Sequence, residues 1–374
     1  MVKKTEKTRE EKILEITKKI EVLGKDLIAE INRQENPHLD IPIRGSNNVF
    51  FDEQNKKIQL GDKKSKRYLF NVAHARRFMQ TMLVASYVKK DLLANNLTAT
   101  LRDLYYAKKH TIKGTKEDTI DEQKESDLAI VDFEVALETF RERLHLRAEP
   151  KGRMAGDMVV LDRVRDKVDK IDLSKMGSGG WAVPSIVEQI EFQDVGIEYV
   201  LVAEKNAIFD RLNEDEYWAK NKCLLMTTAG QAARGARRLL QRISDEIKVP
   251  IYCLTDADPY GWYIYSTMKY GSMALAHESD RLGCPQMKFL GMSISDIEHY
   301  DLKAVTIKAK DVDIKRAEEM KNYDWFKYPA WQKEIDKFLD KKIKAEIQSL
   351  SSKNLQYISS TYLPEKIAGK DFLP

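Results

Sequence analysis

Cysteine is scarce in this chain. Three cysteines, at positions 223, 253 and 284, stand singly among 374 residues. None belongs to a Cys-x-x-Cys pair, and none has histidines at the spacing that a zinc site requires. The sequence therefore argues against a disulfide framework and against structural zinc, and we expect three buried thiols in a reducing compartment.

Long apolar runs are also missing. No stretch approaches the ~18 uninterrupted apolar residues of a membrane-spanning helix. The opening residues MVKKTEKTREEK lack the apolar core of a signal peptide. We therefore expect a cytoplasmic protein with no membrane partner.

Charge of one sign is in small excess only. Lys and Arg number 63 and Asp and Glu 59, a balance that by itself does not indicate a nucleic-acid partner. The basic residues nevertheless cluster in short runs, including KKSKR at 63–67, RERLHLR at 141–147 and RGARR at 234–238. Each run alone is typical of a solvated face, whereas together they would suit a track for DNA phosphates.

A chain of 374 residues, 43% of them hydrophobic, can form two or three domains with a sizeable core. Residues 9–33 predict a helix with a heptad-like apolar seam, formed by Ile13, Ile16, Ile20, Leu23, Leu27 and Ile31. Two interpretations remain open: the helix packs on its own domain, or it docks a partner. We assign residues 1–40 to an N-terminal helical extension.

The next hundred residues predict a winged helix-turn-helix. VFFDEQNKKIQL, within 49–70, predicts a β-hairpin, and helices are expected over 71–94 and, after a break at Asn95-Asn96, over the segment TLRDLYYAKKH at 100–110. A polar loop at 113–127 and a helix at 128–143 follow. We assign residues 41–148 to this domain, because Pro150, Gly152 and Gly156 break the pattern near 145–155.

The hydrophobic period then changes to that of alternating strands and helices. Short β-rich runs at 199–204, 223–228, 250–258 and 287–292 are separated by helical stretches at about 206–214, 231–247 and 260–278. This alternation predicts a parallel α/β sheet. Residues 312–350 predict amphipathic helices. The predicted fold is therefore a multi-domain α/β protein, with residues 149–374 forming the α/β domain and its added helices.

No nucleotide-binding fingerprint is present. GSGGW at 177–181 lacks the lysine and hydroxyl residue of a phosphate-binding P-loop, so we expect a mobile or tight-turn loop there.

Acidic residues follow two of the predicted strands. YVLVA runs into Glu204, and IYCLT runs into Asp256-Ala-Asp258. The functional crevice of a parallel sheet lies outside the carboxyl ends of its strands. Oxygen ligands near a phosphate track suit Mg²⁺, although an Asp-x-Asp pair also serves as a helix N-cap. We predict that Glu204, Asp256 and Asp258 are metal ligands.

The two neighbouring tyrosines at 105 and 106 are separated by helical phase. Thr100 and Asp103 form a capping-box pattern that fixes the helix start. Tyr105 then falls with the leucines and is expected in the core. Tyr106 falls with Arg102, Lys109 and His110, and cationic neighbours favour the phenolate form of a tyrosine. Tyr106 is therefore a candidate nucleophile towards a phosphodiester.

Taken together, these motifs resemble the type IIB DNA topoisomerase family, that of topoisomerase VI A subunits and the meiotic double-strand-break transesterases. The resemblance rests on LRDLYY at 101–106, AEPKGRMAGD at 148–157 and the Toprim-like set formed by Glu204 and DADPYG at 256–261. It implies that Tyr106 attacks DNA and becomes joined to the 5′-phosphate. It also implies that Arg102 stabilises the transition state. Glu204, Asp256 and Asp258 would bind Mg²⁺, and Tyr260 stands where many Toprim proteins carry a third acid.

The resemblance further implies an ATP-dependent enzyme that cleaves, passes and religates double-stranded DNA, so that DNA is relaxed and decatenated. It implies an A2B2 heterotetramer in which the A subunits dimerise and the B subunit binds ATP. Each tyrosine would act opposite the partner's Toprim site, and the helix at 13–31 would dock the B subunit. Two alternatives remain: a winged-helix DNA-binding protein without catalysis, and a Toprim nuclease that uses metal but no tyrosine.

Overall fold

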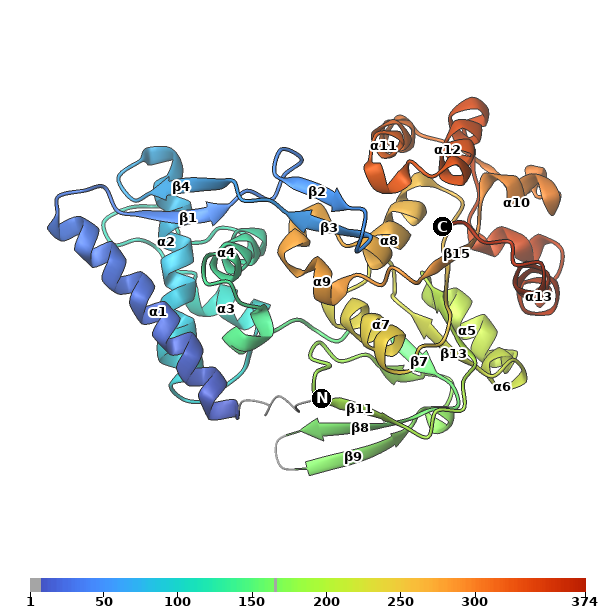
Figure 1. Ribbon diagram of the computed structural model, residues 1–374, viewed down its shortest axis with the longest axis horizontal. Helices are drawn as coiled ribbons and strands as arrows, with labels where there is room; N and C mark the ends of the chain where they lie inside the picture. The colour runs from blue at the N-terminus through green and yellow to red at the C-terminus, as the bar shows by residue number, and fades with distance from the viewer. Residues whose placement is uncertain (1–7, 165–166) are drawn as a thin grey trace. The chain divides into compact units, whose positions relative to one another are not determined.

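The computed structural model describes residues 8–164 and 167–374 (Figure 1). Residues 1–7, over which we expect no signal peptide, lie outside them. The chain forms two compact units: unit 1 comprises residues 1–49 and 60–149, and unit 2 comprises residues 50–59 and 150–374. No helix within the described residues is long and apolar enough to cross a membrane. The three cysteines are buried and unpaired.

Unit 1 is a helical unit with one pair of strands. Its elements are α1 (Arg9–Asn32), β1 (His38–Pro42), β4 (Lys64–Tyr68), α2 (Val72–Tyr87), a π-helical turn (Val88–Leu93), β5 (Ala99–Thr100), α3 (Leu101–Lys108), α4 (Gln123–Ala136), a 3-10 turn (Arg141–Leu144) and β6 (Leu146–Arg147). Strands β1 and β4 pair antiparallel, and β5 and β6 make a short parallel contact. Helix α4 begins at Gln123, so the loop that the sequence predicts over 113–127 is shorter than expected.

Helix α1 packs on its own unit. Ile16, Ile20 and Leu27 are buried, and Ile13 and Leu23 pack partly buried against the same core. The apolar seam therefore meets the interior of unit 1, as the first of the two interpretations predicts. Its outer surface still exposes Leu14, Val22 and Ile28.

The hairpin that the sequence predicts forms, but it belongs to unit 2. Strands β2 (Val49–Asp52) and β3 (Lys57–Leu60) pair with each other, and the Phe51 ring lies edge-on to Tyr270 at a centroid distance of 5.4 Å. The Gln59 side-chain amide donates to Asp280 Oδ1 at 2.7 Å. The strand pair beside the helices of unit 1 is instead β1–β4, which no pattern in the sequence predicted.

Unit 2 is built on a six-stranded sheet of order β10-β7-β13-β12-β14-β15. Its parallel part is β12 (Tyr199–Ala203), β13 (Cys223–Thr227), β14 (Ile251–Leu254) and β15 (Lys288–Gly291), and β7 (Arg153–Ala155) and β10 (Trp181–Ala182) extend it antiparallel. Helices α5 (Asn206–Glu214), α7 (Arg234–Glu246) and α8 (Pro259–Tyr270) connect the parallel strands. The predicted α/β alternation is confirmed, and the sheet is mixed rather than wholly parallel.

A second sheet of unit 2 precedes most of these strands in sequence. It has the order β11-β8-β9, from β8 (Val159–Val164), β9 (Lys167–Asp172) and β11 (Ile190–Gln193). It is a further element that the sequence did not predict. The remaining helices are α6 (Tyr217–Lys220), α9 (Ser279–Leu282), α10 (Ile294–His299), α11 (Asp311–Lys321), α12 (Pro329–Lys341) and α13 (Leu363–Ala368).

The tail departs from the predicted helix over 312–350. Helix α12 ends at Lys341, and β17 (Ile343–Lys344) begins an extended segment that pairs with β16 (Ile307–Lys308). The physical reason is the alternation of IKAEIQ at 343–348, in which the apolar residues recur at a period of two. Ala345 and Ile347 are buried accordingly.

Candidate active site

Tyr106 lies on the exposed face of helix α3 in unit 1. Thr100 and Asp103 form the predicted capping box: the Asp103 N–H donates to Thr100 Oγ1 at 3.1 Å, and the Thr100 N–H donates to Asp103 Oδ2 at 2.8 Å. The Tyr106 side chain is 62% exposed. The Arg102 guanidinium lies 6.0 Å from the centre of its ring, and a hydrogen bond with Tyr106 raises the pKa of Arg102.

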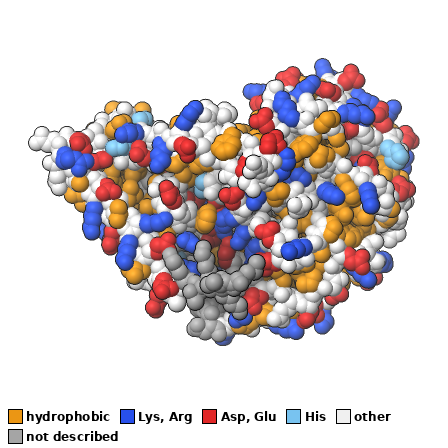
Figure 2. Space-filling model, in the orientation of Figure 1, with side chains coloured by type: hydrophobic (Ala, Val, Ile, Leu, Met, Phe, Trp, Pro, Cys, Tyr) orange, Lys and Arg blue, Asp and Glu red, His pale blue; other side chains and the backbone are white. Residues whose placement is uncertain are grey.

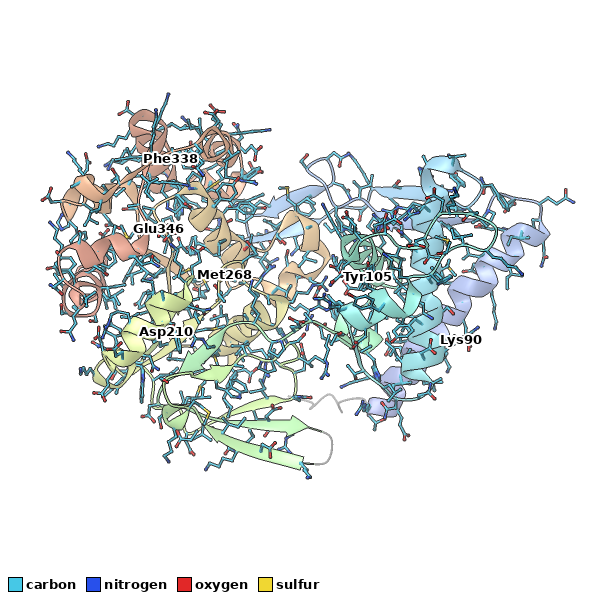
Figure 3. The ribbon with its side chains drawn as sticks, turned by 180° about the vertical axis from the view of Figure 1, so that it is seen from behind. Lys90, Tyr105, Asp210, Met268, Phe338 and Glu346 are labelled. Atoms are coloured by element: carbon cyan, nitrogen blue, oxygen red, sulfur yellow. The ribbon has the colours of Figure 1, made fainter. Side chains whose placement is uncertain are left out.

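Tyr105 (labelled in Figure 3) is only half-buried, so it is less deeply packed than expected. Its hydroxyl donates to the Asp121 carbonyl at 3.1 Å. The Lys109 ammonium donates to the Tyr105 hydroxyl at 3.2 Å and to the same carbonyl at 3.1 Å. Lys109 therefore accompanies Tyr105, and the expected grouping of Lys109 with Tyr106 is wrong. Helix α3 ends at Lys108, and Lys109 has extended backbone angles, so helical phase no longer applies to it.

Several arginines of the predicted phosphate track are held by acids. In unit 1, Asp132 is 1% exposed and pairs with Arg44 Nη2 at 2.6 Å, with Arg67, and with Arg77 Nε at 3.9 Å. Arg76 pairs with Asp121 and Glu125. These guanidinium groups have carboxylate partners inside the unit, so they are less available to DNA than the sequence clusters suggested.

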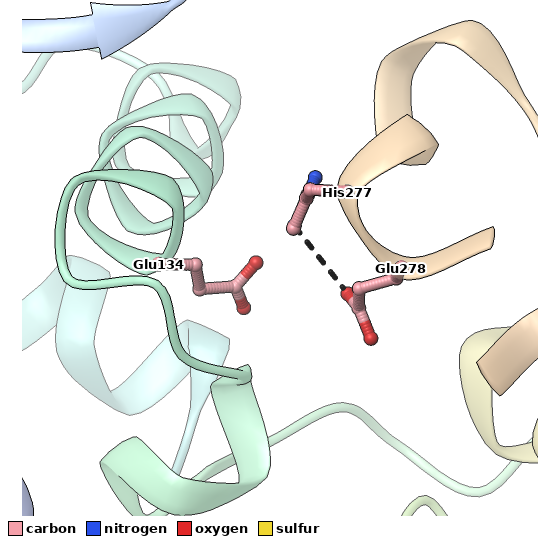
Figure 4. A group of neighbouring side chains, drawn as sticks. All are labelled: Glu134, His277 and Glu278. Carbon is pink, nitrogen blue, oxygen red and sulfur yellow. Dashed lines mark ion pairs between the residues drawn. The ribbon is translucent and has the colours of Figure 1, made fainter. Parts of the chain in front are cut away.

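The RGARR run of unit 2 is likewise engaged. Arg234 Nη1 lies 2.6 Å from Glu278 Oε1, and burial lowers the pKa of Arg237 to about 10. His277 lies beside the buried Glu278, with Nε2 3.7 Å from Oε1 (Figure 4). Figure 2 shows Lys and Arg side chains interspersed with Asp and Glu over the face in view. On that face, no broad area of one charge stands out.

The acids of unit 2 lie at the carboxyl edge of the sheet, where the strand order reverses. Strand β12 is followed in sequence by β13 on one side, and β14 pairs on the other side, so the crevice at this switch point opens beside β12. Glu204 follows β12, and Asp256 follows β14. The Asp256 N–H points at Glu204 Oε2, 3.5 Å away. Adjacent strands therefore bring the two predicted ligands together.

Asp258 serves as the N-cap of α8, as the alternative interpretation of the Asp-x-Asp pair proposed. Its Oδ1 accepts from the Gly261 N–H at 2.7 Å. The other oxygen, Oδ2, lies 3.8 Å from the Lys344 ammonium. Gly261 is required here because a Cβ atom would lie 2.7 Å from the Asp256 carbonyl oxygen. Capping thus uses one oxygen of Asp258 and leaves the other for a second role.

Electrostatic repulsion within the acid cluster is incompletely relieved. Burial, together with the charges of Asp256 and Asp258, raises the pKa of Glu204 to about 7. Burial also raises the pKa of Asp258, and Asp256 adds to the effect. A cation among these oxygens would favour the ionised carboxylates, and hard oxygen donors without thiolate or imidazole suit Mg²⁺. The residues present therefore fit a magnesium ion.

Two lysines that no sequence motif had indicated lie among these acids. Lys205 Nζ is 2.7 Å from Asp256 Oδ2, and Lys344 Nζ approaches Asp258. Among the described residues, Glu204, Asp256 and Asp258 do not form a set whose oxygens all lie within 4.8 Å of one another. The period-two alternation of residues 343–348 is the signal that could have placed Lys344 on an exposed strand face.

Comparisons with known proteins cover the whole of this architecture. Residues 76–146 match the N-terminal family described as type IIB DNA topoisomerase, residues 149–196 match the all-beta domain of the DNA topoisomerase VI alpha chain, and residues 199–367 match the Toprim domain shared by the topoisomerase 6 A subunit and Spo11. The A subunit of type 2 DNA topoisomerase 6 from Pyrococcus abyssi is 45% identical over 369 residues, which is 96% of this chain and 95% of that protein. The protein of the same description from Sulfurisphaera tokodaii is 45% identical over 364 residues, 93% of each chain.

The fold and these matches define the class: the chain is a type IIB DNA topoisomerase component, with a winged-helix unit and a Toprim unit on a mixed sheet. Within that class, it belongs to the family of the topoisomerase 6 A subunit and Spo11. Its activity is that of the catalytic A subunit of an ATP-hydrolysing type IIB DNA topoisomerase. The two alternatives, an inert winged-helix binder and a Toprim nuclease, are set aside by this membership.

Proposed function

We propose that Tyr106 is the nucleophile of transient double-strand cleavage. Its hydroxyl attacks a backbone phosphorus, the bond from phosphorus to the 3′-oxygen breaks, and the phenolic proton leaves to solvent. The products are a tyrosine ester of the 5′-phosphate and a free 3′-hydroxyl, whose attack reverses the reaction. The observation that supports this proposal most is the exposure of Tyr106 beside Arg102, while Tyr105 is held at its hydroxyl.

Arg102 is proposed to stabilise the charge on the phosphoryl oxygens as Tyr106 attacks. A guanidinium is permanently charged and presents several donors in a plane, which suits a phosphate. Arg102 lies one helical turn before Tyr106 and is exposed, so a phosphodiester can approach both groups from the same side of α3.

Glu204, Asp256 and Asp258 are proposed to hold Mg²⁺. The bound ion would supply Lewis-acid polarisation of a phosphoryl oxygen and stabilisation of the leaving oxygen. The chain's own part is to present oxygens from two adjacent strand ends and from the cap of α8. Because Tyr260 replaces the third acid of many Toprim proteins, one fully ligated ion is the expected number.

The proposed assembly is an A2B2 heterotetramer that acts on double-stranded DNA. The A subunits would form a homodimer in which each Tyr106 works opposite the partner's acids, and ATP would bind to the B subunit. The relatives are described as A subunits, which implies a second kind of subunit. Strand passage through the cleaved duplex and religation would then relax and decatenate DNA.

The outer face of α1 is proposed as the B-subunit docking surface. Its seam is used within unit 1, so the deletion of residues 1–33 would remove core residues and would not test docking alone. The sharper test changes the exposed Leu14 and Ile28 to glutamate, with Leu355→Glu in unit 2 as an equally exposed control. Loss of B-subunit pull-down is expected for the first pair only. Unchanged binding would reject this surface.

The cleavage proposal is tested by trapping covalent protein–DNA adducts with denaturant in the presence of the B subunit, Mg²⁺ and ATP. Adducts are expected with the unaltered chain and with Tyr105→Phe, and none with Tyr106→Phe. A protein that only binds DNA would give no adduct at all. A nuclease would go on cutting DNA in Tyr106→Phe. We also propose a cytoplasmic location, which the three buried, unpaired thiols support.

A further inference from the structure

Residues 343–348 form one side of the acid cluster in unit 2. The Ala257 N–H donates to the Ala345 carbonyl at 2.9 Å, and the Ile347 N–H donates to Asp256 Oδ1 at 2.9 Å. In an extended segment, side chains two residues apart point to the same face. Ala345 and Ile347 are buried, so Lys344 and Glu346 (labelled in Figure 3) share the opposite face, where both reach partners in the acid cluster.

Lys205 bridges two carboxylates of different kinds. Its ammonium nitrogen lies 2.7 Å from Asp256 Oδ2, a proposed metal ligand, and 3.2 Å from Glu346 Oε2, which is not one. It also lies 3.2 Å from the Gln348 side-chain oxygen. The lysine can therefore give up Asp256 and keep two oxygen partners.

Lys344 repeats the same arrangement on the other aspartate. Its ammonium lies 3.8 Å from Asp258 Oδ2 and 2.9 Å from Oδ2 of Asp313, which is buried on α11. Each proposed ligand of the Asp-x-Asp pair is thus approached by a lysine that already contacts a second acid outside the proposed ligand set.

We propose that Lys205 and Lys344 are positioning residues that neutralise Asp256 and Asp258 until a divalent cation binds, and that they then remain paired with Glu346 and Asp313. The inference rests on the proposed metal site. Without the lysines, two partly buried aspartates and Glu204 would repel one another. Without the second acids, cation binding would leave two partly buried ammonium groups unpaired, which is costly. The four residues therefore let the cluster accept a cation without disrupting its surroundings.

The first test measures Mn²⁺ binding to the purified full-length chain by electron paramagnetic resonance, without DNA or the B subunit. Lys205→Met removes the competing positive charge, so Mn²⁺ affinity is expected to rise about tenfold, a change of about 1.4 kcal/mol. Lys222→Met is the control, because Lys222 is an exposed lysine that pairs with an exposed glutamate. Unchanged or weaker binding in Lys205→Met would overturn the proposal.

A double-mutant cycle separates this role of Glu346 from direct metal ligation. If Glu346 retains Lys205 after the cation binds, Glu346→Gln weakens Mn²⁺ binding in the unaltered chain. The same change then has no effect in the Lys205→Met background. If Glu346 were itself a ligand, the loss would be equal in both backgrounds, and the proposed exchange of partners would be rejected.

Failure of the metal site itself would look different. Glu204→Gln and Asp258→Asn should each abolish high-affinity Mn²⁺ binding if the acids hold the ion. Binding that survives both changes would contradict the proposed metal site and the inference with it. Binding lost in these variants, but unaltered in Lys205→Met, would refute the lysine exchange alone.

Discussion

Replacing Glu204 by glutamine is expected to stabilise the cation-free protein at alkaline pH while removing its divalent-cation binding. In the native cluster, burial and the charges of Asp256 and Asp258 raise the pKa of Glu204 to about 7, from an ordinary value of 4.5. Ionisation of Glu204 therefore lowers the free energy of unfolding. Glutamine has nearly the same shape and no charge, so it relieves the repulsion without opening a cavity.

The pKa shift sets the size and the pH range of the effect. At about 1.36 kcal/mol per pKa unit, it corresponds to about 3 kcal/mol as an upper bound. The glutamine amide needs a hydrogen-bond acceptor that the carboxylate did not, so we expect a net gain of about 1–2 kcal/mol. Because the folded-state pKa is raised, the stabilising contribution of protonated Glu204 is complete below the unfolded pKa of 4.5 and is lost as the pH rises through 7. The advantage of Glu204→Gln should thus be small at about pH 4.5 and complete above about pH 8.

Thermal unfolding in EDTA over a series of pH values measures this effect. For a unit of this size, about 1 kcal/mol shifts Tm by roughly 2–4 °C, so Glu204→Gln should melt about 2–8 °C higher at about pH 8. Glu198→Gln is the matched control, because Glu198 precedes the same strand and its side chain is 67% exposed. A lower Tm for Glu204→Gln at alkaline pH, or a difference that does not change with pH, would refute the reasoning.

Two further substitutions and one network follow from the contacts. Tyr105→Phe loses the hydroxyl's bond to the Asp121 carbonyl, so unit 1 should lose about 1 kcal/mol in chemical denaturation while adducts still form. Gly261→Ala forces a Cβ against the Asp256 carbonyl, so Mn²⁺ affinity should fall, and unaltered affinity would show that α8 can shift freely. Asp132→Asn leaves three arginines without their shared, buried acid and should cost about 3–5 kcal/mol of stability, which calorimetry would detect as a lower Tm for unit 1.

The sequence was most informative where local rules and tertiary packing agree. The capping box of Thr100 and Asp103 and the helix that follows formed as predicted. The four parallel strands also lie where apolar runs predicted them, because strands buried on both faces are apolar throughout. Placing Glu204 and Asp256 at the ends of such strands was then sufficient to bring them together.

The sequence was least informative where a strand is exposed or a side chain leaves its helix. Strand β9 presents mostly charged, exposed residues and lacks an apolar face, so no periodicity marks it. Lys109 follows the last residue of α3, where the backbone turns and takes the lysine to Tyr105. Lys205 and Lys344 act through partners distant in sequence, which no local pattern connects.

The central claim is that one tyrosine of the doublet carries the chemistry. Its most direct measurement is mass spectrometry of the peptide that remains attached to DNA after adducts are trapped and digested. The account predicts a phosphotyrosyl bond at Tyr106 to the 5′ end of the broken strand. A DNA link at Tyr105, or at a 3′ end, would contradict it.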